Sequence, residues 1–212
     1  MPMPKEEVSW LELVNEYGTY HLTRMQADKK TRPLAESFKK RQDVLEERGI
    51  AFIAAKRAQV AAEAAYAGYD LEIDTMIKEL YFTKLTACGN NRSDESFSRW
   101  FPEGLSEMIR KNQTVDIGHA RDLILVLSET PDDPIVAHYI PGLSAAAESC
   151  TEALDDCKLR VSKAEEASRL VEEEKNNWHA AYTKDHAEIL SLFSGNKRIA
   201  DSFFKAGPES SF

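Results

Sequence analysis

Apolar side chains recur at every seventh position between residues 33 and 87, and Gln59 is the only polar member of this row. The row consists of Phe38, Leu45, Phe52, Gln59, Tyr66, Ile73, Leu80 and Ala87. A second row is offset by four and consists of Leu34, Arg41, Arg48, Ala55, Ala62, Tyr69 and Met76. Its early part contains two arginines, and its later part is apolar. Two such rows form the seam of a coiled coil. They predict one long helix that begins at Pro33, which suits a first turn, and ends before Gly89, which suits a helix C-cap.

A second long heptad pattern follows Pro141 and stops before Gly195. Its first row consists of Ala147, Leu154, Val161, Ser168, Lys175, Tyr182 and Ile189. Its second row, offset by three, consists of Cys150, Cys157, Ala164, Val171, Trp178, Asp185 and Leu192. Lys175 and Asp185 interrupt these rows, and polar seam residues of this kind can fix the register of a helix pair. We therefore expect a second long helix from Pro141, with Gly195 at its end.

Shorter elements are predicted around the two long helices. Ser9 and Glu12 have the spacing of a capping box and predict a first helix that ends near Asp28. Phe97, Trp100 and Phe101 form an aromatic cluster that we interpret as a plug over one end of a bundle. The stretch Thr130–Pro134 is the clearest break in the chain, and we expect a short turn from Ile135 to Tyr139 after it.

Together these elements predict an all-α fold. We expect an elongated antiparallel helical bundle, similar to a coiled coil, with two long helices and several short ones in a single domain of residues 1–212. The halves 33–109 and 141–207 resemble each other, because each opens at a proline, continues as a heptad helix and closes on a glycine and an aromatic cluster. This order suggests a pseudo-twofold repeat of helical hairpins, joined by a connector of short helices over residues 90–140.

Charge narrows the classes of partner. The net charge is −9, and residues 112–212 hold most of it, with 10 basic and 18 acidic side chains. Because sequence-independent nucleic-acid binding requires clustered positive charge, we expect no nucleic-acid partner. One basic cluster is present, and it consists of Lys29, Lys30, Arg32, Lys39, Lys40 and Arg41. It is either a solvated helix start or a docking patch for an acidic protein or anionic lipid.

Three cysteines, an odd number at low density, favour a reducing compartment over a disulfide framework. The first residues lack the apolar core of a secretory signal, and no run of about 20 apolar residues is present. These features predict a cytoplasmic protein. The alanine-rich segment from Ile50 to Tyr69 is interrupted by Lys56, Arg57 and Glu63, so a membrane partner is not favoured.

Candidate catalytic and metal-binding groups are scattered. A di-iron bundle needs two Glu-x-x-His motifs on facing helices, and the nearest match is Asp116-x-x-His119, with Asp122 one turn further on. His179 and His186 share a helix face, but two ligands on one helix do not complete a metal site. The chain has no Cys-x-x-Cys, no glycine-rich phosphate loop and no nucleophile elbow. We therefore predict no cofactor and no metal.

Three functions remain as alternatives. The leading hypothesis is a non-catalytic interaction or scaffold protein that binds another protein or a second copy of itself through a heptad seam. The second is a membrane-binding or remodelling protein that uses the alanine-rich segment and the basic cluster. The third is a metal-dependent enzyme built on His119, His179 or His186. For the seam itself, burial of Phe52 would make Phe52→Ala cost about 3–5 kcal/mol.

Overall fold

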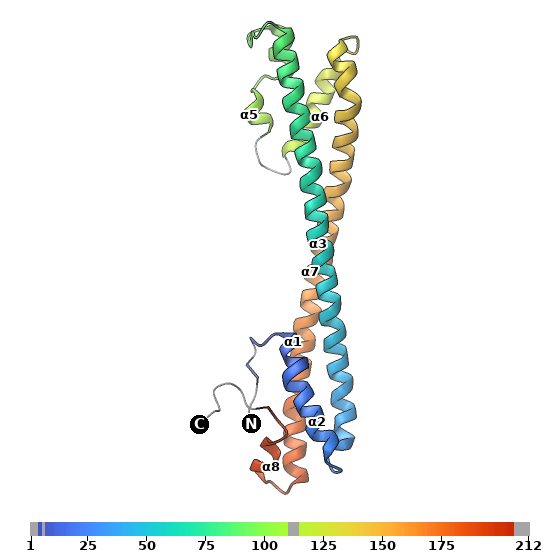
Figure 1. The fold of residues 1–212 in the computed structure, drawn as a ribbon, viewed down its shortest axis with the longest axis vertical. Coiled ribbons are helices and arrows are strands. Elements are labelled where there is room, and N and C mark those ends of the chain that lie inside the picture. Colours follow the sequence, from blue (N-terminus) through green and yellow to red (C-terminus); the bar gives the residue numbers. More distant parts are fainter. Residues whose placement is uncertain (1–3, 6, 110–114, 206–212) are drawn as a thin grey trace. The chain divides into compact units, whose positions relative to one another are not determined.

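The computed structural model describes residues 4–5, 7–109 and 115–205, and within these ranges it contains helices and no strand. The all-α prediction is therefore confirmed for the described part of the chain (Figure 1). In chain order the elements are α1 (Trp10–Glu12), a π-helical segment η1 (Leu13–Gly18), α2 (Thr19–Ala27), α3 (Arg32–Ala87), α4 (Glu95–Trp100), α5 (Leu105–Met108), α6 (Val115–Ser128), α7 (Pro134–Leu192) and α8 (Lys197–Asp201).

The chain forms two compact units, and both long helices contribute to each of them. Unit 1 contains the chain up to residue 57 and from residue 162 onward, whereas unit 2 is the continuous stretch 58–161. The two halves expected from the sequence, 33–109 and 141–207, divide the chain differently. The internal repeat between those halves stays a prediction.

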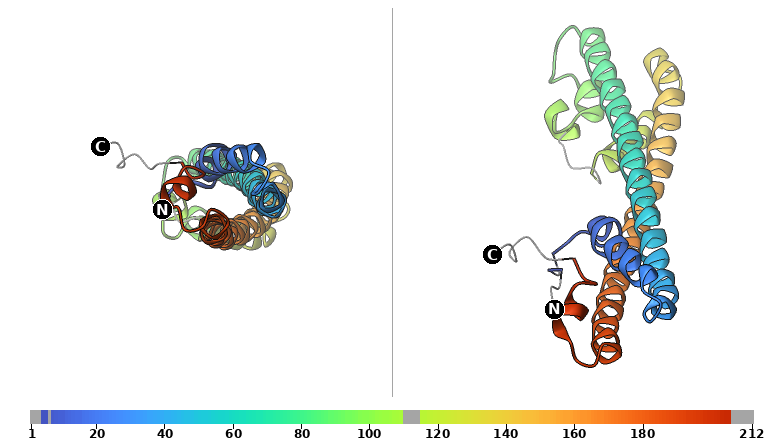
Figure 2. Two further views of the ribbon diagram at one scale, coloured as in Figure 1. Left: turned by 90° about the horizontal axis from the view of Figure 1, so that it is seen from below. Right: turned by 60° about the horizontal axis from the view of Figure 1, so that its bottom comes forward.

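In unit 1, the first part of α3 packs against the last part of α7, and α2 lies beside both (Figures 1 and 2). Phe38 of α3 contacts Trp178 and Tyr182 of α7, with ring centroids 5.4 and 6.0 Å apart. Arg41 donates to Glu174 at 2.8 Å. Because the residue number rises along α3 as it falls along α7, the two helices run antiparallel in this unit.

The predicted rows of α7 are confirmed in this core. Trp178, Tyr182 and Ile189 have 0% exposure. The two polar exceptions, Lys175 and Asp185, are also buried. Leu192 is 42% exposed because it is the last residue of the helix.

His21 is fully buried in unit 1 and connects three parts of the chain. Its Nδ1 lies 3.0 Å from the Phe203 carbonyl oxygen, and its Nε2 lies 3.1 Å from Oδ2 of Asp185. A carbonyl only accepts, so Nδ1–H is the donor of the first bond. The ring also stacks on Phe204, with centroids 4.4 Å apart. These contacts hold the segment after α8 against α2 and α7.

The first helix begins as predicted, since the Ser9 side chain accepts a hydrogen bond from the Glu12 N–H at 3.2 Å. Its π-helical segment was not predicted. It lies where the Gln42 side chain approaches the helix backbone and donates to the Val14 carbonyl at 3.3 Å. A Cβ on Gly18 would lie 1.9 Å from Oε1 of Gln42, so a larger residue here would force the end of the Gln42 side chain to move.

Helix α3 starts one residue before the predicted Pro33 and ends at Ala87, as expected. Gly89 has φ +64°, which confirms its role after the helix end. The first predicted row is confirmed at Phe38, Leu45, Tyr66, Ile73 and Leu80, all of which are buried. Phe52 and Gln59 are partly buried, and Ala87 is exposed.

The prediction that the second long helix begins at Pro141 is wrong, because α7 begins at Pro134. The expected short turn from Ile135 to Tyr139 is helical. Asp133 accepts from the Ile135 N–H at 2.9 Å, and Pro134 occupies the first turn, where a proline costs nothing. Pro141 then lies inside the helix. Val136 and Leu143, each 1% exposed, anchor the helix to the core on both sides of it.

In unit 2, the second part of α3 packs against the first part of α7 and against α4 and α6. The predicted aromatic cluster is part of this core, since Phe97, Trp100 and Phe101 are 2–3% exposed. Tyr81 of α3 meets Phe97 and Phe101 edge to face, with centroids 5.1 and 4.9 Å away. The cluster thereby fixes the short segment 95–108 that forms one wall of a pocket.

Candidate functional site

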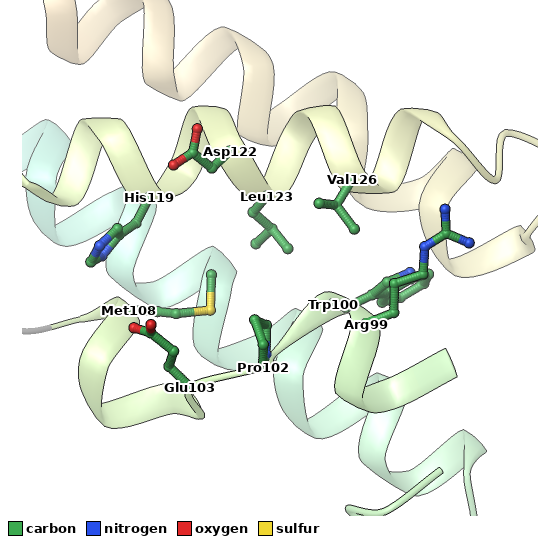
Figure 3. A pocket seen from close by; sticks show the side chains of 9 residues that line it. All are labelled: Arg99, Trp100, Pro102, Glu103, Met108, His119, Asp122, Leu123 and Val126. Carbon is green, nitrogen blue, oxygen red and sulfur yellow. The ribbon is translucent and has the colours of Figure 1, made fainter. Parts of the chain in front are cut away.

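A pocket of about 250 Å³ lies in unit 2, between α6 and the chain from α4 to α5 (Figure 3). We call it the α6 pocket. Its apolar lining consists of Trp100, Pro102, Met108, Leu123 and Val126. Leu123 and Val126 extend from α6 towards Pro102, and Met108 reaches from α5 towards α6 beside Leu123, on the side of His119. The polar members are Arg99, Glu103, His119 and Asp122.

The local sequence explains the structure of the segment from α4 to α5, which forms one wall of the pocket. The Asp94 carboxylate caps α4, accepting from the N–H groups of Ser96 and Phe97 at 2.9 and 3.3 Å. The Ser96 hydroxyl also donates to it at 2.6 Å, and this bond is the main reason why the pKa of Asp94 is lowered. Gly104 has φ +81°, a conformation that favours glycine, and it turns the chain from α4 into α5.

Trp100 is held at the pocket edge by a charged contact on its ring. Nζ of Lys84 lies 3.8 Å from the ring centroid and 3.0 Å from Oδ2 of Asp133. Lys84 is only 6% exposed, so cation–π and ion-pair contacts replace the water that its ammonium group loses. Burial works against the lowered pKa of Asp133, but the Ile135 N–H and Lys84 outweigh it. This wall of the pocket is therefore formed before any ligand binds.

The polar groups of the α6 pocket differ in their partners. Arg99 is paired with Glu129, which compensates its charge. Nδ1 of His119 is buried and has no hydrogen-bond partner among the described residues. The Glu103 and Asp122 side chains are exposed. The pocket therefore combines an apolar interior with two carboxylates at its edge.

A second feature of unit 2 is a set of exposed apolar side chains on one side of α3, which we call the outer face of α3. Val60, Leu71 and Phe82 are 60, 63 and 56% exposed. They are eleven residues apart, close to three full turns, so they lie on one side of the helix. Ala64 and Ala67 lie between Val60 and Leu71 and are also exposed, whereas Thr75 and Lys78 lie between Leu71 and Phe82 on the same side. The continuous apolar part of this face therefore runs from Val60 to Leu71, and a continuous exposed apolar patch is typical of an interaction surface.

Unit 2 also holds the charge of the protein. Residues 58–161 contain 9 basic and 18 acidic side chains, whereas the residues of unit 1 contain 18 of each. The net charge of −9 therefore belongs to unit 2 alone. A partner that binds this unit meets an acidic surface.

The predicted basic cluster lies in unit 1, at the start of α3 and the turn before it, and all six side chains are exposed. Lys39 is paired with Asp43 at 2.6 Å, and Arg41 with Glu174 at 2.8 Å. Lys30 lies over the Phe193 ring at 5.2 Å, and Arg32 donates to the Gln26 carbonyl at 3.3 Å. Lys29 and Lys40 complete the cluster. Its role in binding a partner stays a prediction.

The residues of the metal hypothesis are separated. His119 and Asp122 line the α6 pocket, and the Asp116 side chain lies outside the described part of the chain. In unit 1, Nε2 of His186 lies 2.8 Å from Oδ1 of Asp201. Among the described residues, no group of three or more histidine, cysteine or acidic side chains is placed to hold a metal ion.

The three cysteines lie in different surroundings. Cys150 is fully buried in the α7 seam and packs as an apolar residue, as predicted. Cys157 is partly buried. Sγ of Cys88 lies 3.5 Å from both Oδ1 of Asp94 and Oγ of Ser96.

The membrane hypothesis gains no spanning segment, because none of the described helices combines the length and the apolar character needed to cross a bilayer. Most of the alanine-rich segment is exposed. Ala51, Ala54, Ala61 and Ala64 are exposed, whereas Ala62 is 8% exposed.

The α6 pocket and the outer face of α3 were both missed by reasoning from the sequence.

Comparison of the chain with family models, with curated proteins and with solved structures finds no match.

Proposed function

We propose that this protein is a non-catalytic helical interaction protein, and that the outer face of α3 in unit 2 binds a helix of a partner protein. The observation that carries the proposal is the alignment of Val60, Leu71 and Phe82, each more than half exposed, on one side of a well-formed helix. Exposed apolar side chains on one helix face are removed from water when another helix covers that face, which stabilises the complex.

Packing considerations support a helix as the occupant. Ala64 and Ala67 are small, so a second helix can approach α3 closely between Val60 and Leu71. The large side chains at either end, Val60 and Phe82, would fill grooves of the partner. A second copy of the chain is a less suitable occupant, since two copies of unit 2 would bring −9 against −9. The predicted cytoplasmic location stays a prediction.

Site-specific photo-crosslinking tests the proposal. A benzophenone amino acid is placed at Leu71 in cells that make the protein, and at Leu125 of α6 as a matched control. Leu125 is also a highly exposed leucine of unit 2, at 68%. We expect a defined protein adduct from position 71 that is absent from position 125. Val60→Glu in the same chain should remove this adduct, because it places a charge in the apolar contact.

The other outcomes are informative. An adduct that has twice the mass of the chain would replace the partner protein by a second copy, and lipid adducts would favour the membrane hypothesis. No labelling at position 71, or labelling there that Val60→Glu leaves unchanged, would exclude the outer face of α3 as a binding surface. Leu71→Glu should change the free energy of unfolding by less than about 0.5 kcal/mol, since the side chain lies on the surface.

A further inference from the structure

The α6 pocket is too small for most small-molecule ligands. Its volume of about 250 Å³ lies below the roughly 300–1,000 Å³ of typical ligand sites. It is large enough for one bulky side chain. Protein interfaces commonly bury a single aromatic or aliphatic anchor in a pocket of this kind.

The interior of the pocket suits an apolar anchor. Leu123 and Val126 form one side and Pro102 the other (Figure 3). Met108 is flexible and polarisable, so it can adjust to an aromatic ring. Trp100 is fixed by Lys84 at 3.8 Å and does not need to move.

The edge of the pocket suits basic neighbours of that anchor. Glu103 and Asp122 are exposed carboxylates, and the one cation of the lining, Arg99, is already paired with Glu129. The excess of acidic residues in unit 2 acts in the same direction. Charge complementarity therefore favours a segment with lysine or arginine beside the anchor.

We infer that the α6 pocket binds one large apolar side chain, presented by a segment of a partner protein that has basic residues on either side of it. The inference rests on the proposed function only in that the occupant belongs to a protein partner. The pocket contains none of the residues of the outer face of α3, so each site can fail its test while the other passes.

Methionine methyl NMR on the full chain tests this inference. Met108 lines the pocket, whereas Met25 is fully buried in the core of unit 1 and serves as the internal control. The probes are three acetylated, amidated tripeptides, Lys-Phe-Lys, Lys-Ala-Lys and Glu-Phe-Glu. We expect Lys-Phe-Lys to shift the Met108 signal saturably and to leave Met25 unchanged. The other two peptides should bind at least tenfold more weakly, because each lacks one of the two required features.

Two variants locate the binding. Val126→Phe fills the pocket and should weaken the binding of Lys-Phe-Lys at least tenfold. Leu125→Phe adds the same ring at the neighbouring exposed position and should have no effect. If Val126→Phe unfolds, as shown by circular dichroism, the double change Glu103→Gln and Asp122→Asn takes its place and should reduce binding several-fold.

Four results would overturn the inference. They are an unchanged Met108 signal, an equal response to Lys-Ala-Lys, undiminished binding by the filled or neutralised variant, and a Met108 signal that depends on protein concentration without peptide. The last result would identify the occupant as a second copy of the chain. Leu71→Glu should retain full binding of Lys-Phe-Lys, which separates this test from that of the outer face of α3.

Discussion

Gly49 and Gly68 lie in the same helix, α3, but have different surroundings. A Cβ on Gly49 would lie 2.3–2.4 Å from three ring atoms of Trp10, whereas a Cβ on Gly68 would have no neighbour within 4 Å. Gly49 is therefore a site of close packing between α1 and α3. At Gly68 the glycine only lowers the helix propensity.

Alanine at these two positions should consequently have opposite effects. Gly49→Ala should destabilise the protein by about 1–3 kcal/mol, because the rigid Trp10 ring has to move. Gly68→Ala should stabilise it by about 1 kcal/mol through helix propensity. Urea unfolding followed by circular dichroism measures both. Equal effects of the two changes would show that Trp10 does not pack on Gly49.

Asp70 carries a charge that the fold disfavours. Burial, followed by repulsion from Asp74, raises the pKa of Asp70. The folded state therefore binds this proton more tightly than the unfolded state does, so the cost of ionisation is absent below pH 3.8 and develops as the pH rises.

Asp70→Asn should accordingly stabilise the protein at pH 7, by about 0.5 kcal/mol from the removed repulsion. The gain should vanish near pH 3. Thermal unfolding at the two pH values measures it, with the exposed Glu72→Gln in the same helix as control. A gain that persists at pH 3 would contradict the assigned cause.

At the scale of a helix, Phe38 and Phe52 belong to one heptad row but differ in burial. Phe38 is 1% exposed and contacts the rings of His21 and Trp178, whereas Phe52 is partly buried and belongs to neither core. Phe38→Ala should cost about 3–5 kcal/mol. Phe52→Ala should cost about 1 kcal/mol, less than its row alone predicts. Chemical denaturation of the two variants compares them, and equal costs would place Phe52 in a core.

The first heptad row of α3 and both rows of α7 could be predicted because the spacing of their apolar side chains is enough to indicate which helix face is buried. The second row predicted for α3 is confirmed only in part, since Ala62 is buried and Met76 packs against the core of unit 2, whereas Arg41 and Arg48 are exposed. The buried positions are Gln42 and Gly49, one residue further on. Their burial depends on a π-helical turn and on Trp10, which hydropathy does not encode.

The start of α7 and the α6 pocket show a second limit of prediction. Pro141 resembles a helix start, but the Asp133 cap and two buried neighbours outweigh the hydrogen bond that it removes. The pocket combines short segments around Trp100 and Val126 that share no motif. His119 and Asp122 were noted as candidate ligands for a metal, and the aromatic cluster as a plug. His119, Asp122 and the aromatic cluster come close together only because α4 and α6 pack in the same core.

For the whole molecule, the two cores predict two reporters of unfolding. Trp10 and Trp178 lie in unit 1, and Trp100 lies in unit 2. Leu80 is fully buried in the core of unit 2. Leu80→Ala should lower the stability reported by Trp100 by about 2–5 kcal/mol, and that reported by Trp178 by clearly less.

Variants with one tryptophan make this measurement possible. Trp10→Phe with Trp178→Phe leaves Trp100, and Trp10→Phe with Trp100→Phe leaves Trp178. Fluorescence in urea should give separate transitions for the two reporters in the Leu80→Ala background. Coincident transitions would show that α3 and α7 make the two units unfold as one.

Unit 1 combines the residues that precede unit 2 with those that follow it. Unit 2 can therefore fold before unit 1 while the chain is being synthesised. Unit 2 is continuous and is complete once residue 161 has emerged. The segment with Leu13, Phe38 and Leu45 must wait for Trp178 and Tyr182, which are made later. At about 5–20 residues per second this delay is on the order of ten seconds. During that time Leu13, Phe38 and Leu45 lack their partners from α7, so the nascent chain exposes apolar side chains of the kind that chaperones bind.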